Sequence, residues 1–139
     1  MEAYLAGGHA YHATMPTDAL RAFHKAMLET KAAGFERLRA AQWQQGEGVR
    51  ALLRARGIMP VATGEFGAPG VVVSFTTDPD VQNGRKFAAL GLQIAAGVPL
   101  MIDEGADYRS FRIGLFGLDK LLDVPASLAR LEAALDRVF

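Results

Sequence analysis

The sequence contains no cysteine, which excludes several kinds of chemistry at once. Disulfide bonds, zinc sites built on thiolates and catalysis by a cysteine nucleophile all require that residue. A chain without disulfides suits a reducing compartment, so we expect a cytoplasmic protein. An unbroken run of about 18 apolar residues is also missing, so no segment is expected to cross a membrane. The first residues, MEAYLAGG, lack the basic and long apolar stretches of a secretory signal.

Neither sign of charge is in excess. Lysine and arginine total 15, as do aspartate and glutamate, so the formal net charge is zero. The chain therefore lacks both the basic excess of nucleic-acid-binding proteins and the acidic tails of disordered segments. With 139 residues, of which 50% are hydrophobic, the sequence is long enough for one globular domain with its own core.

The first 57 residues are expected to form an arm followed by helices. Residues 1–15 show no clear period and contain a pair of glycines, which favours an extended arm. Residues 16–57 carry apolar side chains three and four positions apart, which predicts a helical region. We expect breaks or bends near Gly34 and Gly46, because a glycine inside a helix costs about 1 kcal/mol relative to alanine.

Residues 58–139 alternate between strand and helix patterns. The β-branched run 71–76 predicts a strand, and residues 92–96 and 111–116 predict two more. Asp78 starts a helix after the first strand, and Asp123 caps a final helix with leucines at helical spacing. The whole order predicts an α+β fold in one domain, with a small, mostly antiparallel sheet that has helices on one face.

Arg112 is the most informative polar residue of the predicted strands. Alternation places Phe111, Ile113 and Leu115 on one face of the sheet, toward the helices, and Arg112 on the other face. A guanidinium there can bind a carboxylate through two charge-assisted hydrogen bonds. The same pattern is also that of a solvated arginine on the open side of an antiparallel sheet, so both interpretations remain.

A second polar group precedes the first long helix. The segment YHATMPT, positions 11 to 17, supplies the hydroxyl groups of Tyr11 and Thr14 just before a helix N-terminus. Helix N-termini bind phosphate through free N–H groups and the helix dipole. The alternative is that these hydroxyls cap the helix and that the tyrosine anchors the arm.

Other polar clusters indicate no reaction. His9 and His12 lack the third ligand of a metal site, so no metal is expected. Asp103, Glu104 and Asp107 are typical of a solvated loop, although paired carboxylates can act as acid and base. The four lysines are expected on surface helices or loops, without the desolvation of a reactive amine. No catalytic residue is therefore predicted in this chain.

Two of these signals occur in the same order in one known family. The segment 11–14 with Pro16, YHATMP, resembles the Tyr-His-x-Thr-x-Pro segment of class V pyridoxal-phosphate (PLP) aminotransferases, such as the alanine–glyoxylate and serine–glyoxylate enzymes. The segment FRIGLFG, positions 111 to 117, resembles their C-terminal Arg-Ile-Gly strand. The resemblance covers nearly the whole chain, and Ala13 departs from it where a second histidine is frequent.

The resemblance implies roles for three residues. Arg112 would bind the α-carboxylate of the amino-acid or oxo-acid substrate, and Tyr11 and Thr14 would contact the PLP phosphate, usually that of the neighbouring subunit in a homodimer. The fold would be that of the C-terminal small domain of fold type I PLP enzymes. In the family the reactive lysine lies upstream, so this chain is expected to lack the N-terminal PLP domain and to be inactive alone. The alternative is a stand-alone, non-catalytic α/β binding or dimerisation module.

Overall fold

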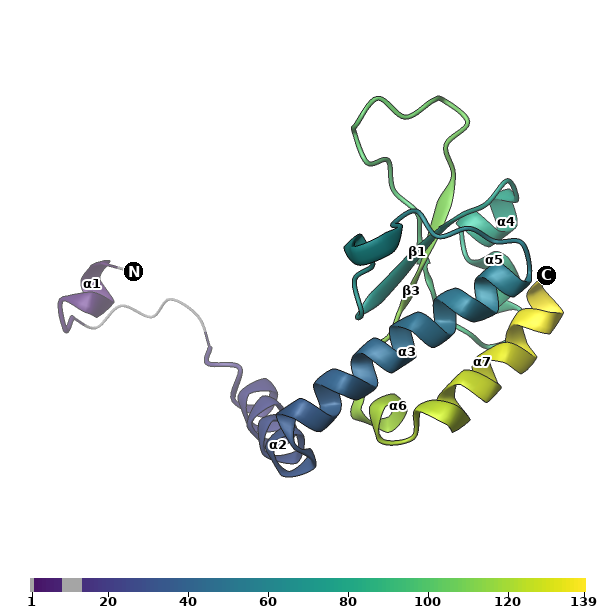
Figure 1. Ribbon diagram of the computed structural model, residues 1–139. Coiled ribbons are helices and arrows are strands. Elements are labelled where there is room, and N and C mark those ends of the chain that lie inside the picture. Colours follow the sequence, from purple (N-terminus) through teal and green to yellow (C-terminus); the bar gives the residue numbers. More distant parts are fainter. Residues whose placement is uncertain (1, 9–13) are drawn as a thin grey trace. The chain divides into compact units, whose positions relative to one another are not determined.

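The computed structural model describes residues 2–8 and 14–139 (Figure 1). The chain divides into two compact units, Met1–Gly34 and Phe35–Phe139. Long N-terminal helices are followed by a small three-stranded antiparallel sheet with further helices, which confirms the predicted α+β class. No helix in the described part of the chain is long and apolar enough to cross a membrane.

The described residues of the first unit form two helices. α1 is a single turn, Glu2–Leu5, so the segment predicted to be an extended arm is helical near its start. α2 spans Thr17–Ala33 and buries none of its residues. Its apolar side chains Leu20, Phe23 and Met27, three and four positions apart, are exposed. Most of the stability of a helix in a protein comes from packing of its apolar face, so α2 presents a surface suited to contact with another part of a protein.

The second unit begins with a long helix that contains two glycines. Gly34 separates α2 from α3 (Phe35–Ala55), as predicted. α3 continues through Gly46 and Gly48, so the expected break near position 46 is wrong. A Cβ at Gly46 would lie 3.0 Å from a backbone oxygen of the loop before the sheet, and one at Gly48 would lie 2.4 Å from the Leu128 side chain. Close packing at both positions offsets the intrinsic cost of glycine in a helix.

The sheet has the strand order β1-β3-β2 and is antiparallel throughout. β1 spans Val71–Phe75 and β3 spans Ser110–Gly114, close to the predicted strands. β2 is only Ala95–Ala96, which is shorter than predicted. Residues 97–109, here called the β2–β3 loop, extend beyond the end of the sheet (Figure 1).

Shorter helices complete the second unit. They are the 3-10 helix η1 (Gly64–Phe66) and the α-helices α4 (Pro79–Gln82), α5 (Arg85–Ala88), α6 (Leu118–Leu122) and α7 (Val124–Val138). α4 and α5 replace the single helix predicted after Asp78, because Gly84 between them has a φ of +82°. α7 is the predicted final helix, and the Asp123 carboxylate caps it by accepting a hydrogen bond of 3.1 Å from the Ala126 N–H.

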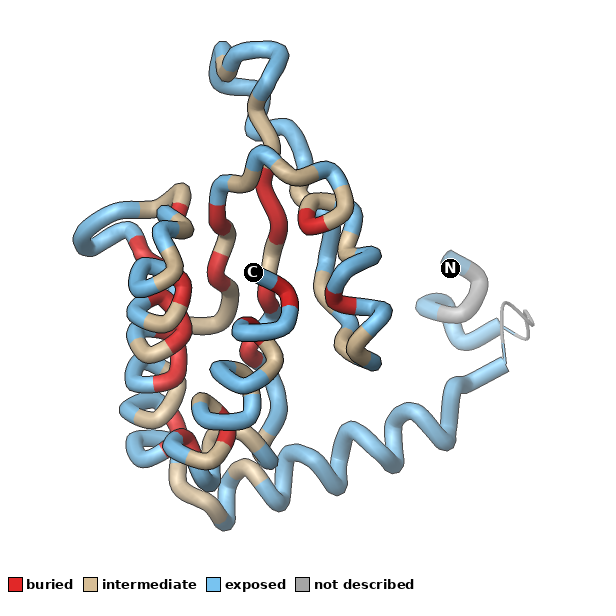
Figure 2. The backbone as a smooth tube through the Cα atoms, turned by 90° about the vertical axis from the view of Figure 1, so that its right-hand side faces the viewer, coloured by how far each residue is buried: buried red, intermediate tan, exposed pale blue. Residues whose placement is uncertain are grey.

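The core lies on the face of the sheet that carries Val72, Phe111 and Ile113 (Figure 2). Its other buried members come from the helices and from the residue after β3: Val49, Leu53, Val81, Phe87, Leu115, Leu135 and Val138. The rings of Phe87 and Phe111 lie 5.8 Å apart, and each lies 6.2 Å from the ring of Phe139. Full burial of each large apolar side chain contributes about 1.5–3 kcal/mol, so this cluster holds the helices on the sheet.

Candidate functional site

Arg112 lies in the middle of the other face of the sheet. In β3 it pairs with Val73 of β1 on one side and with Ala95 of β2 on the other. Its neighbours Phe111 and Ile113 are buried in the core, which confirms the predicted alternation. Arg112 itself is half-buried, so its guanidinium is offered on the face that points away from the core.

The Arg112 guanidinium is held at one of its three nitrogen atoms. Nε donates a hydrogen bond of 3.0 Å to the backbone oxygen of Ala96. Within the described ranges, Arg112 forms no ion pair and its side chain has no other hydrogen bond. The two Nη atoms are therefore available to an external acceptor, and their planar geometry matches the two oxygens of a carboxylate.

Two hydroxyl groups precede Arg112 on the same face. Ser110 and Tyr108 lie two and four positions before it, and a hydrogen bond of 3.1 Å from the Thr76 N–H to the Arg109 oxygen continues the ladder past the end of β3. Both hydroxyls are buried and have no partner among the residues that the structure describes. Residues two apart on a strand are spaced by about 6.6 Å, so the three side chains form a polar row.

Gly97 brings the β2–β3 loop against this row. A Cβ at this position would lie 1.8 Å from the backbone oxygen of Ser110, far inside van der Waals contact. Only glycine therefore permits the approach that places the Ala96 oxygen within reach of Arg112. Of the three residues in this row, the sequence pattern identifies only Arg112. The period-two spacing of Tyr108 and Ser110 before it was the signal that could have identified the rest of the row.

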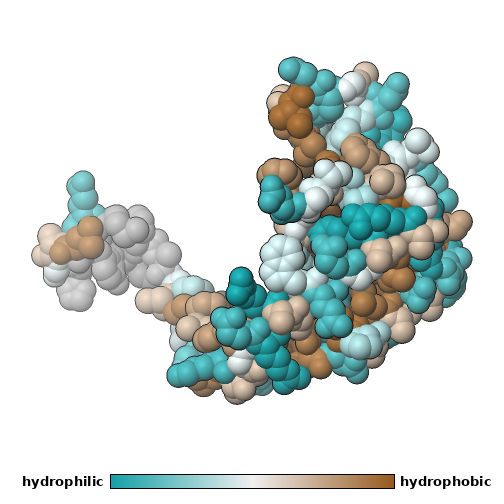
Figure 3. Space-filling view, in the orientation of Figure 1, coloured by the Kyte–Doolittle hydropathy of each residue, from teal (hydrophilic) through white to brown (hydrophobic). Residues whose placement is uncertain are grey.

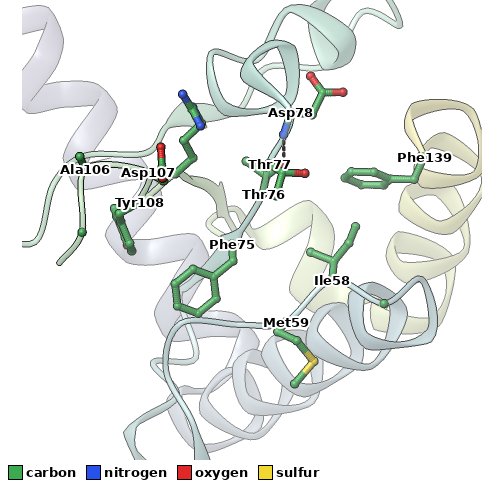
Figure 4. Close-up of a pocket in the computed structure, with 13 residues that line it drawn as sticks. Ile58, Met59, Phe75, Thr76, Thr77, Asp78, Ala106, Asp107, Tyr108 and Phe139 are labelled. Atoms are coloured by element: carbon green, nitrogen blue, oxygen red, sulfur yellow. Dashed lines mark hydrogen bonds between the residues drawn. The ribbon is translucent and has the colours of Figure 1, made fainter.

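A cleft of about 710 Å³ adjoins the Tyr108 end of the row (Figure 4). Phe75 and Tyr108 line it with their rings edge to face, at a centroid distance of 5.8 Å. Figure 4 shows Ile58 and Met59 on the Phe75 side of the same cleft. Arg112 is not among the residues that line the cleft. Tyr108 is the residue of the polar row that does line it.

The carboxylate of Asp78, which also lines the cleft, is already bound. Its Oδ2 lies 2.7 Å from Lys86 Nζ, and its Oδ1 accepts a hydrogen bond of 2.8 Å from the Asp80 N–H. The bond from Lys86, followed by that from Asp80, holds the pKa of Asp78 below its ordinary value. Asp78 is thus an ionised cap of α4, and this position does not suit a proton-accepting base.

Glu104 organises the β2–β3 loop. Its carboxylate accepts hydrogen bonds from the N–H groups of Ile102, Met101 and Leu100. These bonds, with that from Ile102 the largest cause, lower the pKa of Glu104 from 4.5 to about 2. The acidic cluster therefore lies in a loop, as predicted. Within it, the Glu104 carboxylate stabilises the loop conformation through its backbone hydrogen bonds. Met101 and Ile102 are exposed, and Figure 3 shows hydrophobic side chains at the outer end of this loop.

The predicted phosphate contacts belong to the first unit. Tyr11, like His9 and His12, lies outside the described residues, so its role stays a prediction. Thr14 is exposed in the segment before α2. Because Thr14 and Arg112 fall in different units, the structure describes each of them only within its own unit.

None of the four lysines is buried. Lys25 lies 3.7 Å from Glu29, Lys86 pairs with Asp78, and Lys120 donates to a backbone oxygen, whereas Lys31 is exposed on α2. Residues 2–8 and 14–139 hold no group of three or more side chains suited to a metal ion.

The polar row is equipped to bind an anion. Arg112 supplies two nitrogen donors, the hydroxyls of Ser110 and Tyr108 beside it are buried, and the row contains no carboxylate or histidine to accept a proton. No model of a known protein family matches the sequence, and none of the curated proteins compared with it matches either.

Proposed function

We propose that this chain is the C-terminal domain of a PLP-dependent class V aminotransferase, and that Arg112 binds the α-carboxylate of the amino-acid or oxo-acid substrate. The observation that carries the proposal is the Arg112 guanidinium, held through Nε by Ala96 and otherwise unpaired within the described residues. A carboxylate that accepts from both Nη atoms would form charge-assisted hydrogen bonds, which are about twice as strong as neutral ones.

Arg112 would act by positioning the substrate. Two parallel hydrogen bonds from its Nη atoms fix both the place and the rotation of a carboxylate. A substrate held in this way has its reacting C–H bond oriented before the chemical step, which lowers the entropy cost of that step.

The chain offers groups for the phosphate end of a PLP site but no buried lysine. Thr14 is exposed just before α2, where a hydroxyl and the first N–H groups of a helix can contact a phosphate, and we propose Tyr11 beside it. PLP, when bound, supplies an electron sink for the reaction. The reactive lysine, which would also move the α-proton, is proposed to come from a preceding domain.

The exposed face of α2 supports a homodimer. Leu20, Phe23 and Met27 offer an apolar stripe on a helix that buries nothing of its own. We propose that a second subunit covers part of this unit, and that the N-terminal segment reaches the PLP of that subunit. We assign the enzyme to the cytoplasm because its cysteine-free sequence suits a reducing compartment.

The kinetic test uses the enzyme in which this chain follows a lysine-bearing domain. Arg112→Gln is expected to lower kcat/KM for both the amino acid and the oxo-acid by about 10–150-fold, which corresponds to about 1.5–3 kcal/mol. Arg54→Gln is the matched control, because Arg54 is an exposed arginine of α3 that forms no ion pair within the described ranges. Unchanged kinetics in Arg112→Gln would refute the assignment of Arg112 as the residue that binds the substrate carboxylate.

A second test uses the chain by itself. With added PLP, we expect no selective, stoichiometric borohydride-trappable adduct at any one lysine, because none of the four lies in a buried site that would favour it over the others. Trapping at a single lysine would overturn the proposed division of labour between two domains. A mass measurement on the same sample gives the oligomeric state, for which the proposal predicts a dimer.

A further inference from the structure

A second cavity, of about 310 Å³, lies on the helical side of the sheet. Residues of α3, α5, α6 and α7 line it, together with the segment before β2 and the end of β3. An apolar cavity of roughly 150 Å³ is enough to hold benzene, so this cavity has room for a molecule about twice that size. Arg112 does not line it and lies on the opposite face, so the cavity is separate from the proposed substrate site.

Most of the cavity wall is apolar, with one buried polar pair. The apolar side chains are Phe87, Leu92, Ile94, Ile113, Leu115 and Leu131. Gln45 is only 2% exposed, and its amide nitrogen donates a hydrogen bond of 2.9 Å to the Ser127 hydroxyl. The other end of the Gln45 amide is buried without a partner among the described residues. A buried amide oxygen without a partner is costly, and a donor group at the inner end of the cavity would compensate for that cost.

The more exposed part of the wall carries an excess of positive charge. Arg130 of α7 is exposed and forms no ion pair or side-chain hydrogen bond in the part of the chain that the structure describes. Lys120 donates to the Phe116 backbone oxygen at 2.9 Å and lies 3.6 Å from the carboxylate of Asp119. Two cations and one anion therefore surround the outer part of an otherwise apolar cavity.

We propose that this cavity binds a small amphipathic carboxylate. Its apolar body, of about ten to fifteen non-hydrogen atoms, would fill the space between the sheet and the helices. Its carboxylate would pair with Arg130 and Lys120, and a hydroxyl group at the other end would bind the unpaired amide end of Gln45. This site depends neither on Arg112 nor on PLP, so it stands or falls separately from the proposed aminotransferase function.

The first experiment varies the ligand and leaves the protein unchanged. Isothermal titration calorimetry of the 139-residue chain would use p-hydroxyphenylpropanoate, its alcohol p-hydroxyphenylpropanol and its analogue phenylpropanoate. We expect the first to bind at concentrations below about 1 mM, the alcohol to bind at least tenfold more weakly, and phenylpropanoate to bind about fivefold more weakly.

The second experiment varies the protein. Arg130→Gln is expected to weaken p-hydroxyphenylpropanoate about tenfold, whereas Arg137→Gln, at an exposed arginine of the same helix outside the cavity, should leave its affinity unchanged. Gln45→Met should abolish the preference for the hydroxylated ligand, and Gln44→Met, at an exposed position next to it, should keep that preference. Circular dichroism of each variant verifies that it is folded.

The outcomes separate the alternatives clearly. Ligand-induced methyl shifts at Ile94, Ile113 and Leu131, together with the two losses of affinity, would establish the site. If no compound binds at about 1 mM, the cavity holds water only and the proposal is overturned. Equal binding of the acid and the alcohol, or equal binding to Arg130→Gln and Arg137→Gln, would overturn it as well, because the carboxylate would then not be recognised.

Discussion

Replacing Gly97 with alanine is expected to detach β2 from the sheet. The added Cβ would lie 1.8 Å from the backbone oxygen of Ser110 and 2.3 Å from its carbonyl carbon. Because ordinary contact begins near 3.4 Å, the two segments would have to separate by roughly 1.5 Å. The obstructing atoms belong to the backbone and cannot rotate away as a side chain can, so the strand itself must move.

The cost of this movement follows from what β2 contributes. Lengthening by roughly 1.5 Å breaks the hydrogen bonds that pair β2 with β3. Because β2 consists only of Ala95–Ala96, it has no further residues that could keep the pairing. The Ala96 oxygen would also withdraw from Arg112 Nε. Overpacking of this kind costs about 1–3 kcal/mol, and each kcal/mol lowers the melting temperature of a domain of this size by roughly 3–5 °C.

Thermal and chemical denaturation measure the loss of stability, and NMR spectra of Ala95 and Ala96 report on the pairing of β2. Gly105→Ala is the matched control, because Gly105 lies in the same loop and a Cβ there would meet nothing within 4 Å. We expect the control to melt like the wild type. A Gly97→Ala protein of unchanged stability with β2 still paired would refute the packing argument.

Two further predictions concern Arg50 and Glu104. Arg50 is 3% exposed and donates to the backbone oxygen of Ala68 at 2.6 Å, so Arg50→Ala should lower the free energy of unfolding by about 2–4 kcal/mol in urea titrations, whereas the exposed Arg54→Ala should change it little. The pKa of Glu104 is lowered from 4.5 to about 2, so the ionised form stabilises the folded loop. That stabilisation is present above pH 4.5 and is lost as the pH falls toward 2, which hydrogen exchange at the Ile102 amide should show in the wild type and not in Glu104→Gln.

The central strand shows how far local pattern predicts this fold. Phe111, Ile113 and Leu115 alternate with Arg112, and a single period-two rule is enough to place the first three in the core and the arginine on the other face. The final helix was predictable for a similar reason, since its leucines repeat at helical spacing and Asp123 begins it. Both signals are contained within a few neighbouring residues.

Features that depend on distant contacts could not be read in this way. α3 was expected to break because Gly46 and Gly48 are poor helix formers, yet each lies against a segment far away in the sequence. The unpaired hydroxyls of Tyr108 and Ser110 were missed because their burial arises from packing across the sheet. The need for glycine at position 97 likewise becomes clear only from its close approach to the Ser110 backbone.

The central claim, that Arg112 recognises a carboxylate, is tested most directly by a double comparison of ligand and protein. The dissociation constants of the substrate carboxylate and of the matching carboxamide would be measured on the PLP-loaded enzyme with Arg112 intact and with Arg112→Gln. We predict that the intact enzyme prefers the carboxylate by tenfold or more, which is about 1.4 kcal/mol, and that the variant shows no preference. An equal preference for the carboxylate in both proteins would contradict the account, because the group that binds it would then lie elsewhere.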